Sequence, residues 1–197
     1  LVDGWGPRQD ARMRKLGRPP LSPWAKENNV NGIDAGGCDI FHHAPQPVHL
    51  AMVGKLVDIV GDLPNVTWHD GNEVSRCGGT VREWVDGLER EVRIAESQNG
   101  FVKHLFGSNA LELDVLRSPK VQYVSHHDFD HVGPTQGKAS WLNEYPNCQQ
   151  PPVWEAQARR NLKAWSGFVF WRDECSDGVM AETLLRMAAI QNKEPWP

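Results

Sequence analysis

The sequence predicts an α/β fold made of parallel strand–helix units. Two observations support this prediction. Short runs of apolar and β-branched residues alternate with longer segments in which apolar residues recur every three or four positions, as in strands and amphipathic helices. Polar motifs follow most of the strand-like runs, as in folds whose loops after parallel strands meet at one edge of the sheet and carry the chemistry. The 197 residues are enough for a single domain.

The first 47 residues differ from the remainder of the chain. They are rich in Gly, Pro, Asn and Arg and show little apolar periodicity. Residues 1–6, which include Trp5, are expected to form the tail of a strand. Residues 3–47 are expected to form a long loop region, and loops of that length commonly act as lids or binding loops.

Helices are predicted where apolar residues repeat with helical spacing. The first covers residues 48–63 and ends before Pro64. The second opens at a capping box that runs from Thr80 to Glu83. Two further helices are predicted over residues 151–165, with Gly167 as the C-terminal cap, and over residues 179–191.

Five strand-like runs alternate with these helices, and each leads into a polar or aromatic motif. The runs cover residues 66–68, 103–106, 121–125, 139–142 and 168–171. The motifs are Asn72-Glu73, Asn109, His126-His127, Asn143-Glu144 and Trp171. Because the carboxyl ends of parallel strands lie at the same edge of a sheet, these residues are expected to share one site.

The composition argues against several classes of function. No segment approaches the roughly 20 apolar residues of a membrane span, and a net charge of −4 without a basic stripe argues against nucleic acid. We therefore expect a soluble protein with neither membrane nor nucleic acid as a partner. The chain begins at Leu1 without a signal-peptide pattern, so either a leader has been removed or the chain is a fragment. Nine tryptophans are many for this length, and their flat rings suit the faces of sugars.

The other histidines and the cysteines are assigned structural roles. His42, His43 and His49 are expected in loops or at the surface. His69 and His104 are placed in strands and are expected to be hydrogen-bonded core residues. The four cysteines show no CxxC zinc pattern, and neither a metal nor another cofactor is expected.

Two glutamates stand out because each follows a strand-like run and an asparagine. Glu73 and Glu144 lie 71 positions apart in the sequence. Two carboxylates that are held by strand ends and face one cavity are what hydrolysis of a glycosidic bond requires. The pair therefore indicates cleavage of a carbohydrate.

These motifs, taken in order, resemble those of the clan A glycoside hydrolases, which are (β/α)8 TIM barrels such as cellulases and mannanases. The resemblance rests on Gly71-Asn72-Glu73 after one strand, Glu144 after a later strand and Trp171 after the last. Residues 23–33 and 57–66 also look like segments of cellulase-like bacterial members. The resemblance covers nearly the whole chain and implies retaining hydrolysis of a β-linked oligo- or polysaccharide.

The resemblance implies a role for each matching residue. Glu73 matches the acid/base glutamate at the end of the fourth barrel strand, and Glu144 matches the nucleophile at the end of the seventh. Asn72 matches the asparagine that hydrogen-bonds the sugar 2-hydroxyl. The other expected substrate-binding residues are His127 or, less well matched, His126 on the sixth strand, Trp171 on the eighth, and Asn109 and Trp5.

Two departures from the family pattern affect the expected architecture. A whole barrel needs about 250 residues, and the match starts near the end of the third strand, so the barrel is expected to be incomplete at its N-terminus. The 71 positions between the glutamates hold three strand–helix units, so the fifth and sixth helices must be very short or replaced by loops. Exposed strand edges would then favour self-association or completion by another chain.

The cysteine positions suit a secreted enzyme. In the implied barrel, Cys38 and Cys77 fall in the loops after the third and fourth strands. Cys148 and Cys175 fall in the loops after the seventh and eighth strands. Each pair is placed to form a disulfide, as in an oxidising compartment, and four free thiols are the alternative.

Two alternative functions stay open at the level of sequence. Residues 125–133 resemble the His-x-His-x-Asp-His motif of metallo-β-lactamase-fold hydrolases, although Asp128 replaces the second histidine and no histidine follows His131. The other alternative is a carbohydrate-binding remnant without turnover, because the implied barrel lacks strands.

Overall fold

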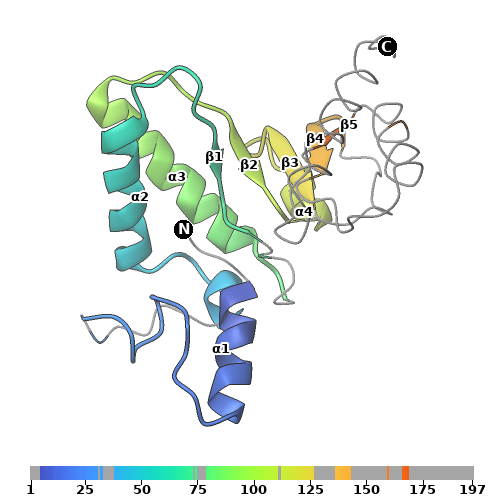
Figure 1. Ribbon diagram of the computed structural model, residues 1–197. Helices are drawn as coiled ribbons and strands as arrows, with labels where there is room; N and C mark the ends of the chain where they lie inside the picture. The colour runs from blue at the N-terminus through green and yellow to red at the C-terminus, as the bar shows by residue number, and fades with distance from the viewer. Residues whose placement is uncertain are drawn as a thin grey trace, which may run out of the picture. The chain divides into compact units, whose positions relative to one another are not determined.

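A computed structural model of the chain describes residues 5–30, 32, 38–72, 74, 79–110, 112–126, 136–142, 159 and 166–168. The chain divides into two compact units, Leu1–Gln122 (unit 1) and Tyr123–Pro197 (unit 2). Helices and strands alternate along the described part of unit 1, and the described elements of unit 2 are strands (Figure 1).

Most of the described elements belong to unit 1. In chain order they are α1 (Trp5–Lys15), the 3-10 helix η1 (Cys38–His42), α2 (Pro47–Val60), β1 (Trp68–His69), α3 (Arg82–Asn99), β2 (Phe106–Ser108) and α4 (Leu113–Leu116). The described strands of unit 2 are β3 (Tyr123–His126), β4 (Ala139–Leu142) and β5 (Ser166–Phe168).

The strand pairings within each unit are parallel. In unit 1, β1 pairs with β2, with Trp68 opposite Phe106. In unit 2, β4 pairs with β3 on one side and with β5 on the other. Parallel strands alternating with helices confirm the predicted α/β class. The predicted helix over residues 48–63 and the strand over residues 139–142 are confirmed as α2 and β4.

The N-terminal segment corrects the prediction of a loop over residues 3–47. Helix α1 occupies eleven of these residues and η1 occupies five more, and Trp5 lies in the first turn of α1 and not in a strand. Pro7 suits a first helical turn, Gly17 has a positive φ of 66°, and the last turn is basic. The helix was missed because its sequence has no apolar stripe, so its formation rests on propensity and end signals that periodicity does not detect.

Two predicted helix ends are also wrong. Helix α3 has Val81 as its N-cap, and no side chain caps it, although the hydroxyl of Thr80 accepts a bond from the N–H of Arg82 at 3.5 Å. Val81 is fully buried, so packing rather than capping chemistry fixes the start of this helix. Gly167 lies in β5 opposite Trp141 and is not a helix cap.

The core of unit 1 lies where α2 packs against α3 (Figure 1). The largest buried ring is that of Trp84 on α3, which makes an edge contact with Phe41 of η1 at 5.1 Å between ring centroids. Gly87 permits close packing at this point, because a Cβ there would lie 2.3 Å from Cδ of Pro45. The smaller apolar residues of this core are Val57, Val85, Leu88, Val92 and Ala95.

His49 belongs to this core, which corrects its expected place in a loop or at the surface. It lies in the first turn of α2, is fully buried and accepts a bond from the N–H of Gln46 on Nδ1 at 3.2 Å. Its ring centroid lies 5.1 Å from those of both Trp24 and Trp84. The histidine therefore connects the segment around residue 24 to α3.

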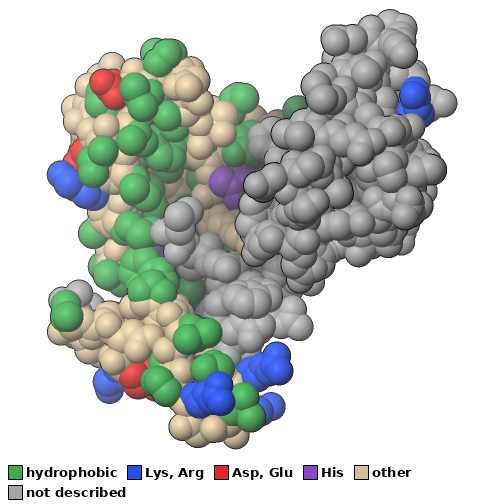
Figure 2. Space-filling view, in the orientation of Figure 1, with side chains coloured by type: hydrophobic (Ala, Val, Ile, Leu, Met, Phe, Trp, Pro, Cys, Tyr) green, Lys and Arg blue, Asp and Glu red, His purple; other side chains and the backbone are tan. Residues whose placement is uncertain are grey.

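The connection between β2 and β3 is one of the two in which the helix was expected to be very short or replaced by a loop, and its helix is short. Helix α4 has only four residues, Leu113–Leu116. Apolar side chains also reach solvent at Leu56 and Ile59 on α2 and at Leu63 just beyond its end, and Figure 2 shows hydrophobic side chains over this part of the molecule. Within the described ranges, every helix is too short or too polar to cross a lipid bilayer.

Candidate functional site

A buried polar cluster lies where β1 and β2 end. It consists of His69, Asp70, Ser108 and Asn109, and we refer to it as the Asp70 cluster. The Ser108 hydroxyl donates to Oδ2 of Asp70 at 2.5 Å, and the Asn109 N–H donates to Oδ1 at 3.1 Å. Nδ1 of His69 lies 3.2 Å from the same Oδ1. One carboxyl group thus joins the ends of two neighbouring parallel strands.

The backbone of Asp70 is held as firmly as its side chain. Its N–H donates to the carbonyl of Gly107 at 3.3 Å, which extends the pairing of β1 with β2. Its carbonyl accepts a bond from the indole N–H of Trp84 on α3 at 3.0 Å. Gly71 then turns the chain at a φ of 145°, which favours glycine, and Asn72 follows.

Burial raises the pKa of the Asp70 carboxyl, because the charged form loses its hydration. The charge of His69 and the hydrogen bonds from Ser108 and Asn109 act in the opposite direction without outweighing burial. Titratable groups with shifted pKa values concentrate at functional sites, so the cluster marks this edge as a candidate.

The structure places two of the expected substrate-binding residues at this edge. Asn72 follows β1 and Asn109 follows β2, and the two strands are adjacent and parallel. The N–H of Asn109 is bonded to Asp70, two residues before Asn72. Glu73, the expected acid/base, comes directly after Asn72 and lies outside the described residues.

In unit 2, the ends of three strands are aligned. His126, the last residue of β3, is opposite Leu142, the last residue of β4, and Leu142 is also opposite Phe168 of β5. In the sequence, Glu144 follows Leu142 by two positions and Trp171 follows Phe168 by three. His127, Glu144 and Trp171 themselves lie outside the described residues.

No strand brings Trp5 to the residues at the strand ends. It was expected at the site because residues 1–6 were predicted as a strand tail, and its place in α1 removes that reason. His69 was expected in the core, but its side chain is a quarter exposed and faces Asp70.

Asp70 and Ser108 are site residues that the sequence reasoning missed. Each lies two residues after a predicted strand and within two residues of a motif that was singled out. That position was the available signal, since consecutive polar residues after an apolar run indicate a strand end at a site.

A second polar cluster lies at the opposite end of β1 and β2. It contains Trp68, Glu89, Arg93, Glu96 and His104, and we call it the Glu96 cluster. Oε1 of Glu96 accepts bonds from the Trp68 indole at 2.9 Å and from the His104 N–H at 3.1 Å, and Nδ1 of His104 lies 2.9 Å away. Arg93 donates to Oε2 at 2.6 Å. His104 is thus confirmed as a hydrogen-bonded core residue.

The pKa of Glu96 is lowered although this carboxyl is also buried. Burial raises it, but the bonds from the His104 N–H, Arg93, the His104 ring and the Trp68 indole together outweigh burial. Arg93 also donates to Glu89 at 2.8 Å, so two carboxylates share its positive charge.

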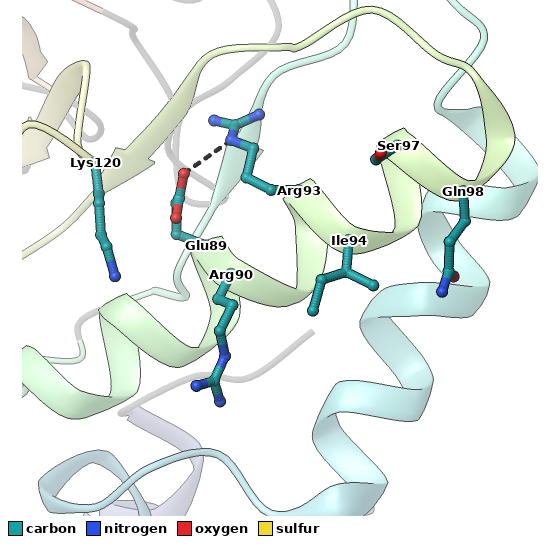
Figure 3. Close-up of a pocket in the computed structure, with 7 residues that line it drawn as sticks. All are labelled: Glu89, Arg90, Arg93, Ile94, Ser97, Gln98 and Lys120. Atoms are coloured by element: carbon teal, nitrogen blue, oxygen red, sulfur yellow. Dashed lines mark hydrogen bonds and ion pairs between the residues drawn. The ribbon is translucent and has the colours of Figure 1, made fainter.

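An open hollow of about 430 Å³ lies on the C-terminal half of α3 (Figure 3). The ion pair between Arg93 and Glu89 lies on its wall. The other lining residues are Arg90, Ile94, Ser97, Gln98 and Lys120. Trp84, near the start of α3, bonds Asp70, so this half of the helix lies toward the other end of the strands. The hollow holds none of the expected site residues.

The described part of the chain contains no group of three or more His, Cys, Asp or Glu side chains arranged to hold a metal ion. Most of the metallo-β-lactamase-like motif at residues 125–133 lies outside that part. Comparison of the chain with protein-family models, with curated proteins and with solved structures finds no match.

Proposed function

We propose that this chain is a retaining glycoside hydrolase that cleaves a β-linked oligo- or polysaccharide, with Glu73 as the acid/base and Glu144 as the nucleophile. The observation that supports this most is that two described parallel strands end shortly before the two Asn-Glu motifs in the sequence. Strand β1 ends at His69, shortly before Asn72, and β4 ends at Leu142, two positions before Glu144. Parallel strands present such residues at their carboxyl ends, where sites of α/β proteins form.

In the proposed reaction, a carboxylate oxygen of Glu144 attacks C1 of the sugar while the glycosidic C–O bond breaks. Glu73 gives its proton to the leaving oxygen, and a glycosyl ester forms on Glu144. Glu73 then takes a proton from water, whose oxygen attacks C1 and releases Glu144. The two carboxyl groups need to lie roughly 5 Å apart, and that proximity keeps one of them protonated near neutral pH.

The remaining residues are assigned to substrate binding. Asn72 bonds the sugar 2-hydroxyl, Asn109 and His126 or His127 contact sugar hydroxyls, and Trp171 offers a flat ring beneath the sugar. No metal or other cofactor takes part in this proposal.

The finer architecture that goes with this function is a (β/α)8 barrel of which the chain supplies the later strands. The exposed apolar side chains on α2 support it, because the sides of neighbouring helices cover one another in a closed ring of helices. We expect the chain to self-associate or to be completed by another chain, in a secreted setting.

The test is hydrolysis of 2,4-dinitrophenyl β-glycosides of glucose, mannose, xylose and cellobiose. We expect turnover of at least one, and we expect Glu144→Gln to abolish it. Glu73→Gln should slow the second step by about 10²–10⁴-fold, with recovery in added azide, which needs no general base. Glu83→Gln, an exposed glutamate on α3, is the matched control and should behave as wild type.

A trapping experiment identifies the nucleophile directly. The 2-deoxy-2-fluoro analogue of the best substrate should leave a glycosyl adduct on the peptide that contains Glu144. An adduct elsewhere, or glycoside binding without release of dinitrophenol, contradicts the proposal. The second outcome favours the carbohydrate-binding alternative, and loss of turnover on chelation favours the metal-dependent one.

A further inference from the structure

The Asp70 side chain links β1 to β2 beyond the strand residues themselves. Strand β1 ends at His69 and β2 at Ser108, so Asp70 and Asn109 are the first residues after their strands. One carboxyl oxygen is bonded by the Ser108 hydroxyl and the other by the Asn109 N–H. Both hydrogen bonds to the side chain therefore come from the end of the neighbouring strand.

The same residue is tied to α3 through the bond from the Trp84 indole to its carbonyl. Trp84 is fully buried among Phe41 and His49, so its indole has little freedom to move. Helix α3 thus holds the backbone of Asp70, and the end of β2 holds its side chain. Asn72 follows Asp70 by only two residues.

We propose that Asp70 is a positioning residue, whose carboxyl group sets where Asn72 and Asn109 lie relative to each other at the edge of the sheet. In the proposed function, a shift of Asn72 also affects catalysis, because the acid/base Glu73 is the next residue in the sequence. This last step rests on the proposed function, whereas the placement of the two asparagines does not.

The surroundings of Asp70 favour positioning over a purely structural role. Among the described residues, the one ionisable side chain that contacts Asp70 is His69, while Glu96, whose side chain is also hidden from solvent, is bonded by Arg93 and by His104. A buried carboxyl with so little compensation costs stability, and groups of this kind are retained where a site needs them. Asn72 follows Asp70 by two residues and Asn109 donates a hydrogen bond to it, and both asparagines are expected to bind substrate.

The test uses Asp70→Ala and Asp70→Asn, with Glu96→Gln as the matched control at the other end of the same strands. An asparagine can accept the bond from Asn109 and donate one to Ser108, so Asp70→Asn keeps the link that Asp70→Ala removes. Two readouts are followed: hydrogen exchange of backbone amides by NMR, and kcat and KM on the best aryl glycoside.

We expect Asp70→Ala to speed exchange at Asn109 and Asn72 by about tenfold or more, because the Asn109 amide loses its acceptor. The value of kcat should fall by about 30- to 100-fold with little change in KM, as for a small displacement of a catalytic group. Asp70→Asn should recover most of both properties. Glu96→Gln should change exchange near Trp68 and His104 and leave kcat within about threefold.

Unchanged exchange at Asn109 in Asp70→Ala would overturn the proposal, and so would an equal loss of kcat in Glu96→Gln. If wild type hydrolyses no glycoside, the proposed function fails, and the exchange rates alone decide whether Asp70 places the two asparagines. If Asp70→Ala does not fold, Ser108→Ala removes one of the two bonds and should produce the same pattern with smaller changes.

Discussion

Asp70 and Glu96 are two buried carboxyl groups that join β1 to β2 at opposite ends, and they differ in how their charge is compensated. Glu96, 3% exposed, is bonded by Arg93, His104 and Trp68, and its pKa is lowered despite burial. Asp70, 2% exposed, is bonded by a hydroxyl and a backbone amide beside one histidine, and burial raises its pKa. Both side chains are almost inaccessible to solvent, but Asp70 lies deeper in the protein than Glu96, so the depth of burial and the partners both contribute to the difference.

The comparison indicates that the two ends of β1 and β2 have different roles. A buried carboxylate with cationic partners is a stable arrangement as long as the partners stay, because each charge is paired and hydrogen-bonded. A buried carboxyl without such partners lowers stability, and the end of the strands that carries it is also the end where Asn72 and Asn109 lie. In α/β barrels the amino ends of the strands serve stability and the carboxyl ends serve function.

The largest expected effect is at the Glu96 cluster. Glu96→Ala leaves Arg93 and His104 without their shared partner, and we expect the free energy of unfolding to fall by about 3–5 kcal/mol. Urea unfolding at pH 7, followed by tryptophan fluorescence, measures this. A loss below about 1 kcal/mol would contradict the comparison, because it would mean that the partners of Glu96 do not stabilise its buried charge.

The next effect is at the helix side of the Asp70 cluster. Trp84→Phe keeps a large ring against Phe41 and His49 but leaves the carbonyl of Asp70 without its donor. We expect a loss of about 1–3 kcal/mol in the same unfolding experiment. A variant as stable as wild type would show that this bond does not hold the end of β1.

Ser108→Ala should have a smaller effect. It removes the hydroxyl that donates to Asp70 and accepts from the N–H of Ala110 at 3.0 Å. We expect a loss of about 1 kcal/mol, because the methyl group of alanine fits and only hydrogen bonds are lost. Exchange at the Ala110 amide should rise with it, and no change there would contradict the assignment.

The smallest expected effects are on how stability changes with pH, and they have opposite signs for Asp70 and Glu96. Burial raises the pKa of Asp70 in the fold, so the stability of wild type relative to Asp70→Asn is greatest below about pH 4 and declines as the pH rises through that raised pKa. Burial also acts to raise the pKa of Glu96, but the bonds from His104, Arg93 and Trp68 prevail and lower it. Relative to Glu96→Gln, wild type should therefore be most stable above about pH 5 and lose that advantage as the pH falls.

Unfolding curves collected at several pH values between about 3 and 8 measure both slopes. If the stability difference from wild type changes with pH in the same direction for both variants, the comparison is wrong. It requires that the fold favours the neutral form of Asp70 and the charged form of Glu96.

The sequence predicted the elements that carry a strong apolar pattern. Helix α2 was located because its apolar residues repeat along one face, and β4 was located as one of the strand-like runs. Helix α1 was missed because its few apolar residues, Trp5, Ala11 and Met13, do not form a stripe along one face. Strand β2 begins three residues later than predicted, because His104 turns toward Glu96 before the strand starts.

The site was predicted in part, for a physical reason that differs between residues. Asn72 and Asn109 were placed at strand ends because polar residues follow apolar runs there. Asp70 and Ser108 were missed because their bond joins residues 38 positions apart, and no local pattern reports such a contact. His49 was misassigned for the same reason, since the ring of Trp84 that buries it comes from another helix.

Helix α3 contributes to both clusters, through Trp84 near its start and through Arg93 and Glu96 near its end. Trp84 and Glu96 are twelve residues apart, or roughly 18 Å along the axis. One inserted residue between them would rotate the distal part by about 100° and shift it by about 1.5 Å. Both anchors could not then be satisfied together, so natural variation in chain length should spare this helix and accumulate in the loops around it.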